Sequence, residues 1–181
     1  MIEVEKLGTI SGDTYKKLGA EIMALGGSDL GENNTNTVFF VSDESRVKVQ
    51  HNTSKNTAKI AWKSGGGLDG VSARQEIELE IDPSRYENAV ELLTAMLASS
   101  SKISSNQTRH DYRLGDVSIA VKHSEDYGYH VEFDLNVESE DETGGAEAEI
   151  FVTAERLNIR VLSASEEEEF IQNSLVQRGK L

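Results

Sequence analysis

The sequence predicts an α+β fold with an antiparallel sheet of eight strands and four helices. Five segments place charged side chains at every second residue, with β-forming residues between them. Most strand-like segments follow one another through short turns, which favours antiparallel pairing over parallel βαβ units. Four further segments carry the signals that begin or end helices. The strands are expected at about residues 1–7, 37–42, 45–51, 57–63, 72–81, 105–114, 116–123 and 128–138.

The charge alternation gives each of these strands an ionic face and an apolar face, because alternate residues of a strand share a side. An ordinary open sheet with its charges in water shows the same pattern, and the pattern alone favours it. The alternative is a closed barrel whose charged faces line a tunnel and whose apolar faces are covered by helices. Eight strands close a barrel wide enough for side chains or one small ligand. The alternating residues are Glu3/Glu5, Arg46/Lys48, Arg74/Glu76/Glu78/Glu80, Arg109/Asp111/Arg113 and Glu132/Asp134.

Two connections interrupt the strands without carrying a recognisable motif. The polar run at residues 28–36 is expected to be a loop, and the Gly-rich run at residues 64–70 a hairpin loop or a lid. The Gly-rich run has no Gly-Lys-Ser/Thr ending and no helix after it, so it does not match a phosphate-binding P-loop.

The helices are expected at four places. The first spans about residues 13–25 and ends at Gly26 and Gly27. The second follows Asp82-Pro83-Ser84 and extends to Leu97. The third spans about residues 145–157, after which Asn158 takes the left-handed position that often ends a helix.

Capping boxes mark the start of the second and fourth helices. Ser84 with Glu87 has this spacing, and so does Ser165 with Glu168. The acidic run at residues 166–169 is therefore interpreted as a first helical turn, where carboxylates meet the positive end of the helix dipole.

Composition is that of one soluble globular domain over residues 1–181. The chain is 37% hydrophobic and 28% charged, with a formal net charge of −14. This charge argues against nucleic acid or an anionic membrane as the main partner. The absence of cysteine excludes disulfide and thiol chemistry. The first residues resemble neither a signal peptide nor a transmembrane span, so a cytoplasmic protein is expected, either a monomer or a homodimer.

Six motifs occur in the order and spacing of one known family. The opening Glu3-Val4-Glu5 is similar to E-x-E-x-K, Arg46-Val47-Lys48 to R-x-R, and Ala61-Trp62-Lys63 to T-x-K. Arg74-Gln75-Glu76-Ile77-Glu78 matches R-x-E-x-E, Gln107 to Tyr112 resembles K-x-R-x-x-Y, and Gly128 to Asp134 resembles G-x-F-x-E-x-E. The chain thus resembles, over nearly its whole length, the CYTH domain of the triphosphate tunnel metalloenzymes. These include class IV adenylyl cyclases, thiamine triphosphatases and inorganic triphosphatases.

The resemblance implies an eight-stranded tunnel with a charged interior, helices packed outside it, and two sets of site residues. Acids of the tunnel would bind Mg²⁺ or Mn²⁺, and bases would hold a small-molecule triphosphate. The implied metal-binding residues are Glu3, Glu5, Glu76, Glu78, Glu132 and Asp134. The implied substrate-binding residues are Arg46, Lys48, Lys63, Arg74, Arg109 and Lys122.

Several residues depart from the family pattern. Leu7 stands where the opening motif has its lysine, Gln107 replaces another lysine, and Lys122 stands where the family usually has an acid. His130 replaces an aromatic residue. These departures affect the expected turnover of substrate, because two bases are missing from the site and one acid is replaced by a base.

The residue chemistry agrees with this interpretation. Phosphoryl transfer needs fixed positive charge around the phosphate oxygens and a bridging metal ion, with little covalent chemistry from the protein. Glu80 and Asp111 are expected to be solvent-exposed or paired structurally. The four histidines lack zinc spacing and are expected at the surface or in packing. No Ser/His/Asp set is evident, so a covalent nucleophile has no support.

The predicted activity is a metal-dependent triphosphatase acting on inorganic triphosphate or a triphosphorylated small molecule. Two alternatives remain open. One is an adenylyl cyclase that forms cyclic AMP from ATP, and the other is a non-catalytic binder of polyphosphate or a phosphorylated ligand.

Overall fold

The computed structural model describes residues 2–42, 45–64, 76–125 and 127–177. Its helices are α1 (Gly12–Ala24), α2 (Tyr86–Met96), α3 (Thr143–Arg156) and α4 (Ala164–Gln177), with short 3₁₀ turns η1 (Pro83–Arg85) and η2 (Glu140–Glu142). Its strands are β1 (Ile2–Thr9), β2 (Ser28–Glu32), β3 (Thr35–Val41), β4 (Ser45–Asn52), β5 (Thr57–Ser64), β6 (Glu76–Ile81), β7 (Ser101–Leu114), β8 (Val117–Ser124) and β9 (Gly128–Val137).

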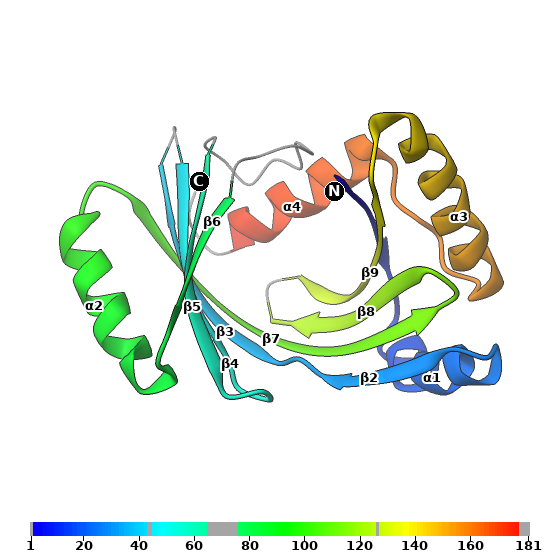
Figure 1. Ribbon diagram of the computed structural model, residues 1–181, viewed down its shortest axis with the longest axis horizontal. Helices are drawn as coiled ribbons and strands as arrows, with labels where there is room; N and C mark the ends of the chain where they lie inside the picture. The colour runs from blue at the N-terminus through cyan, green and yellow to red at the C-terminus, as the bar shows by residue number, and fades with distance from the viewer. Residues whose placement is uncertain (1, 43–44, 65–75, 126, 178–181) are drawn as a thin grey trace.

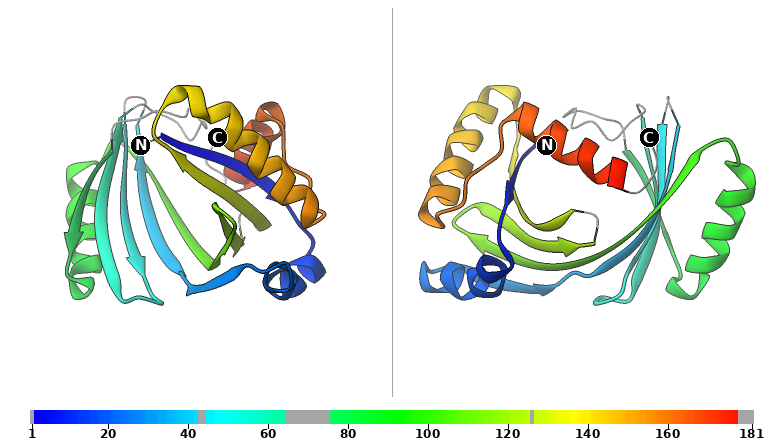
Figure 2. Two further views of the ribbon diagram at one scale, coloured as in Figure 1. Left: turned by 45° about the vertical axis from the view of Figure 1, so that its right-hand side comes forward. Right: turned by 180° about the vertical axis from the view of Figure 1, so that it is seen from behind.

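The strands form one antiparallel sheet that curls around a hollow (Figure 1). The order is β1-β9-β8-β7-β3-β4-β5-β6, and β2 pairs with β7 beside this path. Figure 2 shows the strong curl from a second direction. Within the described residues β1 and β6 do not pair, so the curled sheet is not strictly closed. The predicted antiparallel α+β tunnel fold is confirmed.

The expectation that residues 28–36 form a loop is wrong. Ser28–Glu32 forms β2, and β3 already begins at Thr35. The reason is the length of β7, which continues beyond its pairing with β3 and offers free backbone groups to β2. A register shift lies between Asp29 and Gly31, where Gly31 has φ of +88° and its N–H donates to Asp29 Oδ1 at 2.7 Å.

The predicted ends of α1 at Gly26 and Gly27 and of α3 at Asn158 are confirmed. Gly26 has φ of +87°, and the N–H of Gly27 donates to the carbonyl of Ile22 at 3.0 Å. Asn158 has φ of +53°, and the N–H of Ile159 donates to the carbonyl of Ala154 at 2.9 Å. These hydrogen bonds satisfy carbonyls that the ends of α1 and α3 would otherwise leave without a partner.

Neither predicted capping box forms at the expected serine. Before α2, Asp82 Oδ1 accepts a hydrogen bond from the N–H of Ser84 at 2.8 Å, so Asp82 starts the turn η1. At α4, Ser163 and Glu166 form the reciprocal pair: Ser163 N donates to Glu166 Oε2 at 2.8 Å. Glu166 N donates back to Ser163 Oγ at 3.4 Å. Serines at neighbouring positions have equivalent spacing in the sequence, and only the backbone conformation selects between them.

Helices cover most of the outer face of the sheet. One core joins α1 and α3 to β8 and β9 through residues such as Leu18, Ile119, Phe133 and Ile150. A smaller core joins α2 to β3 and β4. On β6, by contrast, Ile77 and Leu79 are exposed, so helix coverage does not extend to that edge strand. With the apolar faces packed outward, the alternate polar residues face the hollow.

The segment after α3 returns to β1 and places α4 across one end of the hollow. The N–H of Leu162 donates to the carbonyl of Leu7 at 2.8 Å, and Gly8 forms a β-bridge with Val161. The ribbon of α4 then lies between the β9 side and the β3–β6 side (Figure 1). No helix among the described residues has the length and apolar character needed to cross a membrane.

Candidate metal and phosphate site

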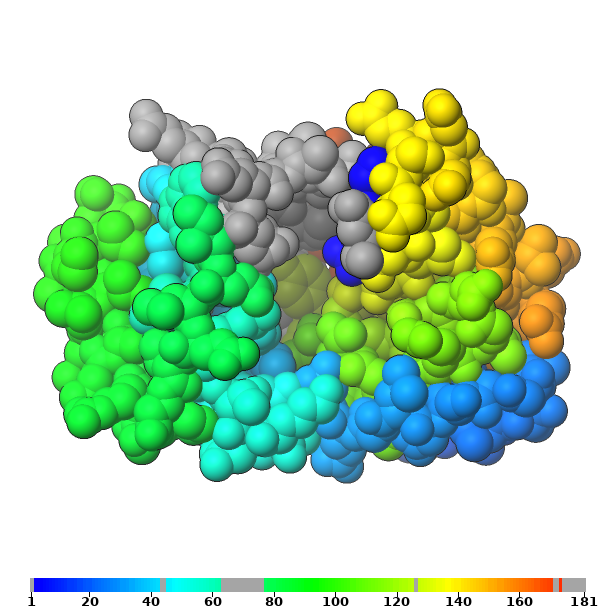
Figure 3. Space-filling view, in the orientation of Figure 1, coloured from blue at the N-terminus to red at the C-terminus, as the bar shows by residue number. Residues whose placement is uncertain are grey.

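Two connected chambers occupy the hollow on the inner face of the sheet. The wide chamber has a volume of about 740 Å³ and reaches Glu3, Lys48 and Asp134. The α4 chamber has a volume of about 300 Å³ and reaches Arg46 and Phe170. Both chambers touch Glu5, Thr35, Gln50, Gln107 and Glu132. The space-filling view shows the surface hollowed between the β5–β6 side and the β8–β9 side (Figure 3).

Three carboxylates meet on one wall of these chambers. Glu5 of β1 lies opposite Asp134 of β9 in the antiparallel register, and Glu132 lies two residues before Asp134 on the same face. One carboxylate oxygen from each of the three lies within 4.8 Å of the others. We call Glu5, Glu132 and Asp134 the acidic cluster. Hard divalent cations such as Mg²⁺ and Mn²⁺ prefer such oxygen ligands.

Two acids of the cluster, Glu5 and Asp134, hold their protons tightly. Burial, reinforced by the charges of Glu132 and Asp134, raises the pKa of Glu5 to about 8. Burial and the charge of Glu132 raise the pKa of Asp134 to about 7. Part of the Glu5 side chain is open to the chamber, yet it lies inside the curl of the sheet and beside two other acids. Enclosure and the neighbouring charges therefore affect the pKa of Glu5 more than its contact with water does.

Two bases lie on the same wall and are already engaged with acids. Lys122 of β8 is buried, and its Nζ donates to Glu132 Oε2. Burial by itself would raise the pKa of Glu132, but the Lys122 ammonium holds that pKa below its ordinary value. Arg109 of β7 donates through Nε to Asp111 Oδ1 at 2.5 Å. Asp111 also accepts from Asn33 Nδ2 at 2.6 Å, which confirms the structural pairing expected for it.

The facing wall carries bases of β4. Arg46 lines the α4 chamber, and its guanidinium carbon lies 5.7 Å from the centre of the Phe39 ring. Lys48 lines the wide chamber. At the far edge, Lys59 Nζ of β5 donates to Glu78 Oε1 of β6 at 2.5 Å. The two walls thus differ in sign, acids dominating on β1 and β9 and bases on β4.

Most residues expected from the sequence line this hollow. Glu3, Glu5, Lys48, Glu78, Arg109, Glu132 and Asp134 all line the wide chamber, as does Glu80, which was expected to be exposed or paired. Lys63 and Glu76 face each other in the β5–β6 register, but their side chains are not described. Arg74 lies outside the described residues. Lys122 is the departure, because it is held against Glu132 rather than placed on the basic wall.

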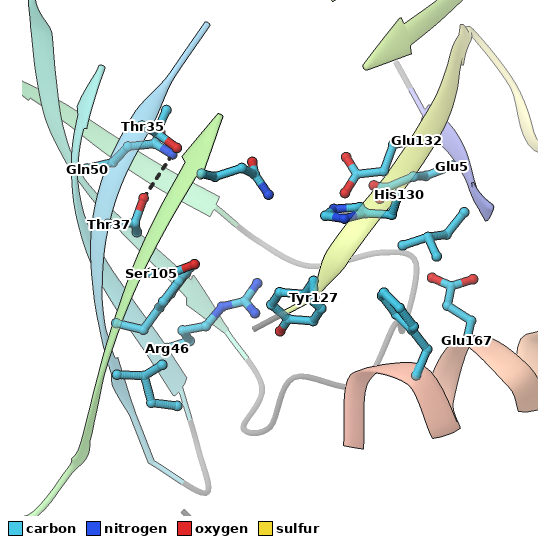
Figure 4. Close-up of a pocket in the computed structure, with 15 residues that line it drawn as sticks. Glu5, Thr35, Thr37, Arg46, Gln50, Ser105, Tyr127, His130, Glu132 and Glu167 are labelled. Carbon is cyan, nitrogen blue, oxygen red and sulfur yellow. Dashed lines mark hydrogen bonds between the residues drawn. The ribbon is translucent and has the colours of Figure 1, made fainter. Parts of the chain in front are cut away.

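Sequence reasoning missed a neutral polar surface on β3, β4 and β7. Thr35, Thr37, Gln50 and Ser105 face the acids across the α4 chamber (Figure 4). Gln50 Nε2 donates to Thr37 Oγ1 at 3.3 Å. Gln50 shares strand parity with Arg46 and Lys48, and Ser105 shares it with Arg109, so the same periodicity would have found these two if uncharged side chains had been counted. The strand β3 contains no charged residue, so Thr35 and Thr37 had no such signal.

The interpretation of the acidic run 166–169 as a helix cap holds for Glu166 and is incomplete for Glu167. The Ser163 N–H, with help from Arg160, lowers the pKa of Glu166 to about 2. Glu167 instead faces the α4 chamber (Figure 4). Phe170 also lines this chamber. Burial raises the pKa of Glu167. The sequence could not show this, because it requires the path of α4 across the end of the hollow.

The expectation of surface or packing positions holds for His51, His110 and His123, whereas His130 lines the α4 chamber. His130 is buried, and burial lowers its pKa to about 4, so it is neutral. His123 stacks on Tyr129 with 4.3 Å between ring centres, and His110 Nε2 lies 2.6 Å from Asp29 Oδ1. In the described part of the chain, none of them joins a group of three metal-binding side chains.

No family model matches the sequence, and the comparison with curated proteins also gives no match. Solved structures do match. The PH1012 protein of Pyrococcus horikoshii OT3 superimposes with a TM-score of 0.69 at 19% identity, covering 88% of this chain and 92% of that one. A candidate adenylate cyclase from Vibrio parahaemolyticus gives a TM-score of 0.65 at 14% identity, with 88% and 90% covered. Another from Bacillus halodurans gives 0.58 at 15% identity, with 90% and 92% covered. The chain therefore shares the fold of these solved structures, and the fold expected from the sequence resemblance is confirmed.

Proposed function

We propose that this protein binds a small-molecule triphosphate together with Mg²⁺ or Mn²⁺ in the tunnel and hydrolyses it. The observation that carries the proposal is the acidic cluster, which faces a chamber whose opposite wall bears Arg46 and Lys48. Separated acids and bases around one cavity match a polyanion bridged by a metal ion, since each charge then finds a partner of opposite sign.

The acidic cluster fits a divalent cation. Its oxygens are close enough to converge on one ion, and the raised pKa values of Glu5 and Asp134 reflect burial together with a repulsion that a cation relieves. Glu5, Glu132 and Asp134 would hold the ion, and Glu3, Glu76 and Glu78 are proposed as further ligands. A bound Mg²⁺ or Mn²⁺ would neutralise charge on the phosphate oxygens.

The bases of the tunnel are proposed to bind the phosphate groups. Arg46 and Lys48 reach the hollow from β4, and Arg109 reaches it from β7. An arginine fork can contact two phosphate oxygens at once, so Arg46 and Arg109 would fix the orientation of the chain of phosphates. Lys63 and Arg74 are proposed for the same role. Their work is positioning, which supplies most of the catalysis in phosphoryl transfer.

Non-catalytic binding is the second candidate, and the pairing on the acidic wall favours it. Lys122 is held by Glu132 and Arg109 by Asp111, so their charges are partly neutralised within the protein. Fewer uncommitted charges around the terminal phosphate weaken stabilisation of the transition state more than they weaken binding.

Product analysis decides between these candidates. Phosphate and pyrophosphate release are measured from inorganic triphosphate and from ATP, with Mg²⁺ and with Mn²⁺, and cyclic AMP is measured from ATP. Metal-dependent phosphate release, faster from inorganic triphosphate, supports the triphosphatase. Pyrophosphate with cyclic AMP supports the cyclase alternative. No turnover with measurable triphosphate binding identifies a binder.

Two substitutions locate the site in the same assays. Arg109→Ala should remove most of the rise in melting temperature that triphosphate produces, because no equivalent donor remains. Glu132→Gln should remove mainly the metal dependence, because the amide keeps the shape and loses the charge. Glu91→Gln, on the exposed face of α2, is the matched control and should change neither. If Arg109→Ala and Glu132→Gln keep the full ligand-induced shift, these residues do not form the site.

A further inference from the structure

Lys122 is a buried lysine within the acidic cluster. Its residue surface is 5% exposed, and no other lysine or arginine of the described residues is this deeply buried. Removing an ammonium group from water is costly unless an opposite charge and hydrogen bonds compensate it. Here Nζ donates to Glu132 Oε2, one of the three carboxylates of the cluster. The strand register therefore builds a cation into the centre of the proposed metal site.

The surroundings make Lys122 the main internal counter-charge of the cluster. Its charge acts on Glu5 and Asp134 as well as on Glu132. His130 lies opposite Lys122 in the β8–β9 register and is neutral, so it contributes no cation. Arg109 lies opposite Lys122 on β7, but its hydrogen bond is directed to Asp111. Three carboxylates are thus balanced chiefly by one ammonium group.

We propose that Lys122 is a built-in cation that occupies one cation position of the acidic cluster and competes there with divalent metal. The ammonium group takes an oxygen of Glu132 and adds a positive charge beside Glu5 and Asp134. An incoming Mn²⁺ must therefore displace Lys122 from Glu132, or use the other two acids alone while facing its charge. The inference rests on the proposed function in one respect, that the acidic cluster is where the metal binds.

The built-in cation has a second consequence, for stability. A cluster of acids without a counter-ion repels itself, and folding then depends on metal. With Lys122 in place, the metal-free fold already has its cation. Lys122 therefore lowers metal affinity and at the same time frees the fold from a need for metal.

Metal binding and melting of the full chain test this inference without an activity assay. Mn²⁺ is titrated calorimetrically into metal-free wild type and into Lys122→Met, which keeps the length of the side chain and loses its charge. We expect about a tenfold or larger gain in Mn²⁺ affinity for Lys122→Met, because one positive charge at the site is removed. We also expect its melting temperature to fall in EDTA and to recover with Mn²⁺, whereas wild type changes little in EDTA. Lys122→Gln, prepared in the presence of Mn²⁺, provides a second uncharged variant if Lys122→Met does not fold.

Lys59→Met is the matched control. Lys59 also lines the wide chamber and also pairs with a glutamate, Glu78, but it lies outside the acidic cluster. Its substitution should leave Mn²⁺ affinity within about twofold of wild type. Glu78 is proposed only as a further ligand outside the acidic cluster, and the Lys59–Glu78 pair is partly exposed, so its charge is better screened.

The outcomes separate the inference from the proposed function. Tighter Mn²⁺ binding by the Lys122 variants, and not by Lys59→Met, supports the inference. If in addition wild type binds no Mn²⁺, the inference still stands, but the proposed metal-dependent activity of wild type fails. Equal affinity in wild type and the Lys122 variants overturns the inference and leaves the proposed metal site standing. If neither wild type nor the variants bind Mn²⁺, both fail. A gain of the same size in Lys59→Met overturns the specific role of Lys122.

Discussion

The two halves of the curled sheet differ in how firmly they are packed. We call β1, β8 and β9 with α1 and α3 the acidic half, and β3, β4 and β5 with α2 the basic half. Among the described residues, the core of the acidic half contains fifteen buried apolar residues and that of the basic half four. Local stability follows the number of buried apolar contacts, so the acidic half should be the more rigid.

This difference matches the chemistry proposed for each half. The acidic half must hold three carboxylates close together against their repulsion, which requires a backbone that cannot relax apart. The basic half presents Arg46 and Lys48, whose long side chains adjust to a bound anion without a fixed backbone. We therefore expect a rigid metal-binding wall facing a more adaptable phosphate-binding wall.

A matched pair of core substitutions gives the largest expected effect. Phe133 of the acidic half and Phe40 of the basic half are both buried, and each is replaced by Ala. Phe-to-Ala substitutions in cores cost about 3–5 kcal/mol, and we expect Phe133→Ala near the upper end and Phe40→Ala near the lower end. The larger core cannot collapse around the cavity, whereas α2 can shift onto the smaller one. Urea unfolding measures both free energies, and equal or reversed costs would contradict the comparison.

A pair of ion-pair substitutions should produce the next largest effect. Glu132→Gln leaves the buried Lys122 without its carboxylate partner and should cost about 2–4 kcal/mol. Glu78→Gln in the β6 edge loses only a pair with the partly exposed Lys59 and should cost less than about 1 kcal/mol. Chemical denaturation in EDTA measures these values. A Glu78→Gln cost equal to that of Glu132→Gln would mean that burial does not distinguish the two walls.

Much of this difference between the two halves could be predicted from the sequence. Strand parity alone puts Glu132 and Asp134 on the face opposite Val131 and Phe133, and short turns determine antiparallel pairing. The alternation of residues along a strand does not show which strands pair with one another. That Glu5 lies opposite Asp134 depends on β1 pairing with β9, a contact between segments far apart in the sequence. Such long-range pairing follows from the packing of the whole sheet.

The parts that could not be predicted depend on local competition or on distant contacts. The strand β2 is polar and forms only because β7 extends past β3. The sequence allows either Ser163 or Ser165 to cap α4, and the backbone conformation selects Ser163. Lys122 was expected among the phosphate-binding bases because of the family resemblance. Its engagement with Glu132 comes from the β8–β9 register and from the burial of both groups.

The pH dependence of stability should come mainly from the acidic half, because the strongly raised carboxyl pKa values belong to the acidic cluster. Glu5 has an ordinary pKa of 4.5 and a folded-state pKa of about 8. The folded state therefore binds this proton more tightly, so the contribution to stability is complete below pH 4.5 and is lost as pH rises through 8. Metal-free protein should melt at a lower temperature at pH 8 than at pH 5.

Glu5→Gln and Mn²⁺ provide the controls for this pH effect. The Gln variant cannot lose the proton, so its melting temperature should fall less between pH 5 and pH 8. Asp134, whose pKa is raised to about 7, keeps part of the slope in that variant. Saturating Mn²⁺ should reverse the slope, because metal binds the deprotonated carboxylates. A metal-free wild type that gains stability from pH 5 to pH 8 would exclude a strained acidic cluster.

The smallest expected effect concerns α4, which faces chamber residues from both halves. Ser163 Oγ accepts from Glu166 N at 3.4 Å, a long hydrogen bond, so Ser163→Ala should cost about 0.5–1 kcal/mol of helix stability. Amide hydrogen exchange along α4 should then become about two- to fivefold faster, since the helix opens locally. Ser165→Ala provides the matched control, because Ser165 stands inside the helix and alanine favours a helix interior. If Ser165→Ala accelerates exchange and Ser163→Ala does not, α4 begins where the sequence alone places it. Glu167 would then lie in the first turn of that later helix, and its place in the α4 chamber would have to be revised.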